Sequence, residues 1–296
     1  MFATPSRTLF ALPYWIAEYR GFFQDEGIAP HLEIIGSGEQ IKARLRSGET
    51  LMSIDPAEGV MIDVHAGGPL RILAGNARKP PLFVIAQPEI KTLADLRGKT
   101  FGVLSLREGS SKFIPKIAAA GGLTPSDYKI VEIGGAPTRI KLLAERKIDV
   151  GLQPMPLNYE AEAQGYTNLG WTGVYEPDYQ FTTLNANVEW AAREPRLAVS
   201  ILRALLRAQR FALTNPDAAS DIIASELRTE KAYALQALRE TASLGILDPE
   251  LNWSDIGLAK VFRNLQDDGL VPPNTSFEVD RYVAREYLRQ AKASLS

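Results

Sequence analysis

The sequence predicts an α/β protein with two lobes, each built on a mainly parallel β-sheet flanked by helices. Its 296 residues are 45% hydrophobic. This chain length is near the upper limit for a single hydrophobic core. The first two-thirds alternates short apolar runs with amphipathic stretches, a pattern typical of β-α-β units. This alternation occurs twice before a helical tail, so two smaller sheets fit better than one very large sheet.

The composition excludes several kinds of function. Cysteine is absent, so disulfides, thiolate catalysis and zinc-cysteine sites are ruled out. The net charge of -2 lacks the basic surplus of a nucleic-acid-binding protein. No apolar run approaches the roughly 18 residues that span a bilayer. The N-terminus shows no signal-peptide pattern. We expect a periplasmic or lipid-anchored extracytoplasmic protein if a signal has been removed, and a cytoplasmic protein if this N-terminus is native.

The elements of the first run can be assigned in chain order. We expect a strand at residues 7–12 and then a helix from Pro13 that carries Trp15 and Tyr19 on its apolar face. Gly27 is expected to end that segment in the left-handed conformation. The remaining elements are strands at 31–35, 51–54 and 70–75, with a short helix at 39–47.

A second run begins at residues 82–86 (LFVIA), a continuous apolar stretch typical of a strand buried on both faces. Further strands are expected at 100–104, 130–133, 149–152, 169–171 and 181–184, with a helical turn at 93–98 and a helix at 137–145. Helices follow from residue 194. Asn215 before Pro216 predicts one helix start, and 279–293 predicts the final helix.

Several stretches resemble one protein family in order and spacing. Residues 12–28 (LPYWIAEYRGFFQDEGI) resemble the first helix of periplasmic binding proteins of the alkanesulfonate, taurine and pyrimidine-precursor (NMT1/THI5-like) type. Residues 90–103 (IKTLADLRGKTFGV) resemble the entry to their second lobe, and 146–151 (RKIDVG) resemble a later strand. The helix at 190–206 also resembles theirs, so the resemblance covers most of the chain.

The resemblance implies a type II periplasmic-binding-protein fold with a ligand cleft between the lobes, which close by hinge motion. Lobe I would comprise residues 1–83 and 182–296, lobe II residues 84–181, and the strands at 82–86 and 181–184 would cross between them. Such a protein is the solute-binding component of an ABC importer. Its expected partners are a small organic ligand, a membrane permease and an ATPase, and it is expected to be a monomer.

Candidate site residues follow from the rule that parallel sheets bind ligands beyond the carboxyl ends of their strands. In the first lobe these are Tyr14, Trp15, Ser37, Gly38, Asp55 and Asn76, with Arg78 nearby. In the second lobe they are Arg107, Ser110, Ser111, Gln153 and Met155, and Thr183 lies near the hinge.

Each candidate has a structural alternative. Tyr14 lies off the apolar stripe and is expected in the cleft, whereas Trp15 is more often a core residue. Ser110 and Ser111 precede a helix and could bind an anion, and Arg107 could pair with a carboxylate or sulfonate. The alternative is an ordinary helix cap beside a solvated arginine.

Two acidic residues have a similar ambiguity. Asp55 and Glu58 could bind an amine, but their spacing is also that of a capping box, the interpretation we prefer for Glu58. His31 and His65 have no partner at metal-ligand spacing, so we expect no metal and no cofactor. Fold relatives of the yeast pyrimidine-synthase type use a cysteine-rich motif, which this chain lacks.

The sequence therefore favours a solute receptor whose ligand is an organic anion such as a sulfonate or aromatic carboxylate, or a heterocycle. The alternative is a cytoplasmic enzyme on the same fold, a decarboxylase or a cofactor-biosynthesis enzyme. In that case Asp55, Glu58 and Arg107 would serve as acid, base and anion clamp. A sensory ligand-binding domain is a third and weaker option.

Overall fold

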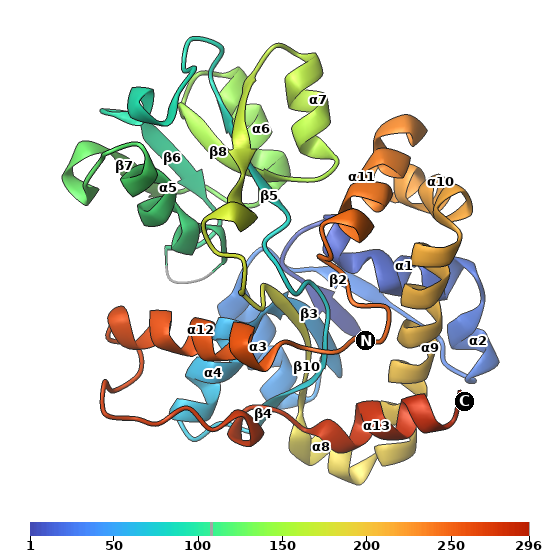
Figure 1. The fold of residues 1–296 in the computed structure, drawn as a ribbon. Helices are drawn as coiled ribbons and strands as arrows, with labels where there is room; N and C mark the ends of the chain where they lie inside the picture. The colour runs from blue at the N-terminus through green and yellow to red at the C-terminus, as the bar shows by residue number, and fades with distance from the viewer. Residues whose placement is uncertain (107–108, 296) are drawn as a thin grey trace. The chain divides into compact units, whose positions relative to one another are not determined.

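The computed structural model describes residues 1–106 and 109–295 and consists of two compact units (Figure 1). Unit 1 comprises Met1–Lys79 and Asp178–Ser296, and unit 2 comprises Pro80–Pro177. The sequence placed the corresponding boundaries after residues 83 and 181. Each unit is built on one five-stranded sheet flanked by helices, so the predicted α/β class with two sheets is confirmed.

Sheet 1, in unit 1, has the strand order β2-β1-β3-β10-β4. Its strands are β1 (Phe2–Thr4), β2 (Leu32–Ile34), β3 (Met52–Pro56), β4 (Leu70–Gly75) and β10 (Thr182–Asn187). β1 pairs in parallel with β2 and β3, whereas β10 runs antiparallel to both β3 and β4. One strand of the five therefore runs against the others, and the sheet is mainly parallel as predicted.

Sheet 2, in unit 2, has the order β7-β6-β8-β5-β9. Its strands are β5 (Leu82–Ala86), β6 (Thr100–Val103), β7 (Lys129–Glu132), β8 (Val150–Pro154) and β9 (Thr167–Trp171). Only β5 is antiparallel to its neighbours, and it occupies the fourth place, as β10 does in sheet 1. Neither β5 nor β10 crosses from one sheet to the other, because each pairs within a single sheet.

Helices cover both sheets. Unit 1 contains α1 (Leu12–Tyr19), α2 (Phe22–Asp25), α3 (Gly38–Ser47), α4 (Ala57–His65), α8 (Val188–Arg193), α9 (Pro195–Thr214), α10 (Pro216–Leu227), α11 (Lys231–Ser243), α12 (Asp255–Asp267) and α13 (Arg285–Ala293). Unit 2 contains α5 (Ile114–Ala120), α6 (Ala136–Ala144) and α7 (Leu157–Ala163). Within the described residues, no helix has both the length and the apolar character that crossing a membrane requires.

The packing of these helices follows their apolar faces. The long helix α9 buries Ala198, Ile201, Leu202 and Leu205, which share one helical face, and packs against α1 and α13. On sheet 1, α3 and α4 pack against β3, β4 and β10 (Figure 1).

The predicted strand at residues 7–12 is wrong. The first strand is β1, and residues 9–11 form a 3-10 turn (Leu9–Ala11) that leads into α1. Pro13 sits in the first turn of α1, where its missing N–H costs no hydrogen bond, so the apolar run continues as helix. Tyr19 is 53% exposed rather than core, because its hydroxyl reaches out to donate to Glu226 Oε1 at 2.8 Å.

The predicted single helix at 279–293 is also wrong. It is interrupted between a 3-10 turn (Val279–Arg281) and α13, where Tyr282 and Ala284 bond to Ile72 of β4. Ile72 N–H donates to the Tyr282 carbonyl, and Ala284 N–H donates to the Ile72 carbonyl, each at 2.9 Å. Because β4 is the edge strand, its outer backbone groups need partners, and this segment supplies them.

A second C-terminal segment covers β4 further along. The Gly75 N–H donates to the Leu251 carbonyl at 2.7 Å, and a Cβ on Gly75 would lie only 2.3 Å from the Asn252 carbonyl oxygen. Glycine is therefore required here by the close approach of backbone rather than by its dihedral angles.

We predict that Gly75→Ala lowers the unfolding free energy by about 1–3 kcal/mol, because the added methyl group forces the two backbone segments apart. The matched control is Gly36→Ala, since a Cβ at Gly36 meets no atom within 4 Å. The control is expected to stay within about 0.5 kcal/mol of the parent. Urea unfolding of both variants measures the difference, and equal midpoints would contradict the close approach.

His65, at the end of α4, lies among aromatic rings. Its Nε2 is 2.8 Å from the Tyr282 hydroxyl, and its ring centroid is 5.8 Å from that of Phe262. Burial, and after it the nearby Arg281 charge, lowers the pKa of His65 below its usual value. The folded protein therefore favours neutral imidazole.

This lowered pKa predicts a loss of stability in acid. The unfolded chain binds a proton on His65 near pH 6.5, before the folded protein does, so stability is complete above that pH and declines as pH falls through it. Chemical unfolding between pH 7 and pH 5 should show this decline in the parent and a shallower one in His65→Gln. An equally steep decline in His65→Gln would contradict the assignment to this imidazole.

Candidate functional site

Three polar candidates of unit 1 meet at one edge of sheet 1. β3 ends at Pro56, β4 ends at Gly75, and the antiparallel β10 begins at Thr182 beside both ends. The register pairs Thr183 with Asp55 on one side and with Gly75 on the other. Asp55, Asn76 and Thr183, which are far apart in sequence, are thus brought to the carboxyl edge of the sheet.

Asp55 is buried and held by a network of donors. Ser53 Oγ and Asn185 Nδ2 both donate to Asp55 Oδ1, at 2.6 and 2.5 Å. Thr183 Oγ1 donates in turn to Asn185 Oδ1 at 2.6 Å. All four side chains are 3% exposed or less. Charge-assisted bonds of this kind compensate for the burial of a carboxylate, so Asp55 is fixed in place by the sheet itself.

Asn76 follows β4 and is fully buried. Its Nδ2 donates to the Phe10 carbonyl at 3.0 Å and to Thr182 Oγ1 at 3.2 Å. Because a carbonyl can only accept, the amide orientation is fixed by chemistry. Its Oδ1 has no hydrogen-bond partner among the described residues, so this edge presents one unused acceptor.

The capping box predicted for Asp55 and Glu58 requires Asp55 at the N-cap of α4, but the structure has Pro56 at that position, without a side-chain capping bond. Glu58 instead is buried and accepts from the Tyr179 hydroxyl at 2.7 Å. Burial, with the Glu58 charge beside it, raises the pKa of Tyr179 well above its usual value.

Ser37 and Gly38 belong to the start of α3. Ser37 caps that helix by accepting from the Gln40 N–H at 3.4 Å, and Gly38 is its first residue. The structure therefore gives Ser37 a local structural role.

The aromatic candidates are both buried, at 1% exposure. Trp15 is core, as the apolar stripe suggested. Tyr14 packs against Phe2 and Phe23, with ring centroids 5.1 and 5.3 Å away, and burial followed by the Glu18 charge raises its pKa. Tyr14 thus lies in an aromatic cluster of unit 1, and its predicted role in a ligand cleft stays a prediction. The helical stripe missed this contact because Phe2 comes from β1, which was not predicted.

In unit 2, β6 and β8 are adjacent parallel strands, so the residues that follow them reach the same edge of sheet 2. Ser110 and Ser111 follow β6 in a 3-10 turn (Gly109–Phe113), and both are buried. Gln153 lies near the end of β8, and Met155 follows it. Arg107 lies outside the residues that the structure describes.

Gln153 is fully buried, and neither its Oε1 nor its Nε2 has a hydrogen-bond partner in the described part of the chain. The same is true of Asn158 in the first turn of α7, which the sequence analysis missed. The edge rule would have found Asn158 if it had been extended from the loop into the next helical turn.

Arg139 of α6 was also missed. It is buried, its Nη2 donates to the Leu152 carbonyl at 2.7 Å, and its Nε has no partner among the described residues. Burial lowers the pKa of Arg139 to about 10. Its sequence signal is the apolar spacing it shares with Ala136 and Leu143, which places a cation on the buried face of the helix.

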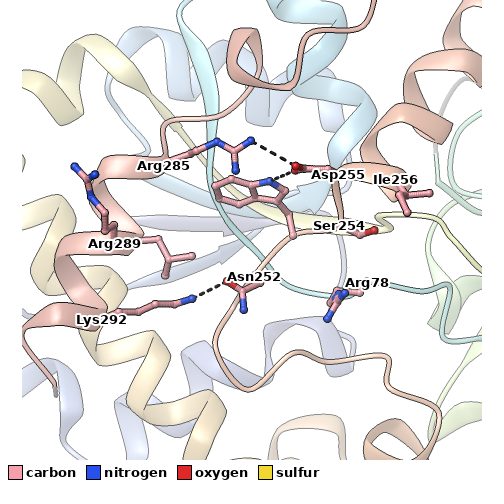
Figure 2. Close-up of a pocket in the computed structure, with 10 residues that line it drawn as sticks. Arg78, Asn252, Ser254, Asp255, Ile256, Arg285, Arg289 and Lys292 are labelled. Atoms are coloured by element: carbon pink, nitrogen blue, oxygen red, sulfur yellow. Dashed lines mark hydrogen bonds and ion pairs between the residues drawn. The ribbon is translucent and has the colours of Figure 1, made fainter.

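A pocket of about 630 Å³ lies on unit 1 (Figure 2). Its lining includes a tryptophan ring and four cations; the residues are Arg78, Asn252, Trp253, Ser254, Asp255, Ile256, Arg285, Leu288, Arg289 and Lys292.

Three of the four lining cations already have partners. Arg78 pairs with Asp248 at 2.7 Å, Lys292 donates to Asn252 Oδ1 at 2.7 Å, and Arg285 pairs with Asp280 at 2.6 Å. Arg285 also lies 5.1 Å from the Trp253 ring centroid. Two of the four cations are thus paired with carboxylates, which reduces the positive charge that the pocket offers to an anion.

No group of three or more histidine, aspartate or glutamate side chains in the described ranges is arranged to hold a metal ion.

Two similarly ordered sheets, each with polar side chains at its carboxyl edge, define an α/β protein of the two-lobe binding-protein class. Residues 11–219 match the family model described as NMT1/THI5 like. The chain belongs to this family, which confirms the resemblance seen in the sequence.

Known proteins of similar sequence or fold include binding proteins. A protein of Brucella abortus, named only in general terms as a binding protein, is 26% identical over 240 residues, covering 77% of this chain and 73% of its own. The periplasmic nitrate-binding protein NrtA of Synechocystis has a TM-score of 0.81 at 16% identity, covering 100% of this chain and 88% of that one. The ligand-binding component of an ABC-type import system from Staphylococcus aureus, with zinc bound, has a TM-score of 0.78 at 12% identity, covering 98% and 97%.

An enzyme has the same fold. The desulfurization enzyme DszB, in complex with biphenyl-2-sulfinic acid and with one cysteine replaced by serine, has a TM-score of 0.71 at 16% identity, covering 99% of both chains. The fold is therefore used for binding and for catalysis, and the side chains must decide between them.

We predict that Asn185→Leu lowers the unfolding free energy by about 1.5–3 kcal/mol, because the buried Asp55 carboxylate loses a donor. Asn274→Leu makes the same chemical change at an exposed position and should stay within about 0.5 kcal/mol of the parent. Urea unfolding measures both. Two equally stable variants would show that Asp55 does not depend on this bond.

Proposed function

We propose that the protein is the solute-binding component of an ABC importer, which captures a small organic solute and releases it unchanged. The observation that carries the proposal is the convergence of buried polar side chains at the carboxyl edge of each sheet, represented by Asn76 in unit 1 and Gln153 in unit 2. Family membership and the import-system component of similar fold support it.

The proposal includes partners and a location. A permease and an ATPase would accept and drive the solute, and the protein would act as a monomer outside the cytoplasm. The nitrate-binding protein of similar fold is periplasmic, which supports this location.

Catalysis is the second candidate, because DszB has the same fold. The side chains favour binding instead. The candidate acid and base, Asp55 and Glu58, are buried and engaged by Asn185 and Tyr179, so neither is set to exchange a proton with a substrate. The chain also has no cysteine to act as a nucleophile.

The test is a solute screen on the purified protein, using organic acids, sulfonates, nitrate and heterocycles. A true ligand at about 100 times its dissociation constant should stabilise the fold by about 2.7 kcal/mol, seen as a rise in melting temperature and verified by titration calorimetry. Mass spectrometry should recover it unchanged. Arg289→Gln, in the surface pocket, is the control and should bind the ligand equally well. Steady conversion of the bound compound would establish an enzyme and overturn the proposal.

A further inference from the structure

The face of sheet 2 that α6 and α7 cover carries three buried polar side chains, which we call the amide cluster: Arg139 of α6, Gln153 of β8 and Asn158 of α7. The connections β7-α6-β8 and β8-α7-β9 advance in the same direction across the sheet, so right-handed crossovers place α6 and α7 on the same face. Gln153 lies on that face, since a Cβ on Gly151 would be 3.1 Å from Gln153 Nε2 and 3.6 Å from Arg139 Cβ.

The amide cluster contains polar atoms that the fold does not satisfy. Arg139 Nε, both amide atoms of Gln153 and both amide atoms of Asn158 are buried without a partner among the described residues. Buried polar groups are nearly always paired, so a group of five unpaired atoms is an exception that needs a cause.

Another buried amide in the same unit behaves normally. Gln87 Nε2 donates to the Leu143 carbonyl at 2.7 Å and to the Ile148 carbonyl at 3.2 Å. The contrast shows that unit 2 can satisfy a buried glutamine with backbone carbonyls, here one from α6 and one from the turn before β8. Gln153 is the second-last residue of β8 and pairs with Phe83 of β5, yet no such carbonyl bonds to its side chain among the described residues.

The unused atoms specify the chemistry of an occupant. Arg139 Nε and the two amide nitrogens offer donors, while Gln153 Oε1 and Asn158 Oδ1 require donors. A sulfonate or nitrate ion has only acceptors and would leave both amide oxygens unpaired. A group with N–H beside C=O satisfies both kinds of atom. The conclusion does not depend on amide orientation, because both ends of each amide are unpaired.

We propose that the amide cluster binds a carboxamide, ureido or lactam group of the solute. This inference rests on the proposed solute-binding function and deepens it by naming the chemical class. In unit 1, taken by itself, the buried Asn76 Oδ1 is likewise an acceptor that lacks a donor, which fits a solute rich in N–H groups.

The first test measures the protein without solute. The side-chain amides of Gln153 and Asn158 have no hydrogen-bond partner among the described residues, and leucine is an apolar residue of similar size. Gln153→Leu and Asn158→Leu should therefore leave the melting temperature unchanged or higher. Gln87→Leu is the matched control and should melt roughly 2–4 °C lower, because two bonds are lost. If Gln153→Leu melts as low as Gln87→Leu, water or protein already satisfies the cluster, and the inference is overturned.

The second test measures binding with defined probes. Benzamide and uracil carry N–H beside C=O, whereas benzenesulfonate and nitrate carry no donor. The parent should be stabilised by the first pair, and Gln153→Leu should bind them at least 10-fold more weakly, while Gln87→Leu retains its affinity.

The outcomes separate the two proposals. Stabilisation by benzenesulfonate or nitrate, without a response to benzamide or uracil, overturns the inference and leaves the solute-binding function in place. Equal affinity of the parent and Gln153→Leu for benzamide or uracil also overturns the inference and leaves the solute-binding function in place. A parent that responds to none of the compounds, including the wider solute screen, contradicts both.

Discussion

The position of β10 between β3 and β4 is the constraint on which unit 1 depends. This strand belongs to the C-terminal segment of the unit, and its hydrogen bonds on both sides join that segment to Met1–Lys79. Because β10 is antiparallel, it starts where its neighbours end. That direction alone places Thr182 and Thr183 beside Asp55 and Asn76. The polar edge is therefore a consequence of topology.

Sheet 2 applies the same constraint with β5 in the fourth position. The two edges nevertheless differ in their polar chemistry. In sheet 1, Asp55 receives two donors from adjacent strands, so the sheet itself satisfies its charge. In sheet 2, Gln153 lies under helices that offer it no partner. One backbone arrangement thus supports a rigid structural network in one unit and an unsatisfied polar cluster in the other.

The sequence predicted those elements whose signal is local. The predicted strands at 70–75 and 82–86 matched β4 and β5 residue for residue. For β5 the signal is a continuous apolar run, which burial on both faces produces. β1 was missed because three residues carry no period and its partners come from β2 and β3. The break before α13 was missed because its cause is the edge of β4. Arg139 was missed because the rule that selects residues at strand ends does not reach the interior of α6, although its spacing with Ala136 and Leu143 places it on the buried face.

Burial alone does not separate a structural polar residue from one that awaits a ligand. Asp55, Gln87 and Gln153 are all buried polar residues of β-strands or their ends, and a sequence pattern treats them alike. What separates them is whether their side chains have hydrogen-bond partners. The side chains of Asp55 and Gln87 have partners, whereas the amide of Gln153 has none among the described residues. An unpaired buried amide costs stability. Two of them in a unit that also buries an arginine are therefore better explained by a role in binding a solute than by a structural role. The surface pocket beside Trp253 is a weaker candidate for the solute site, because carboxylates or amides of the chain already bind three of its four cations.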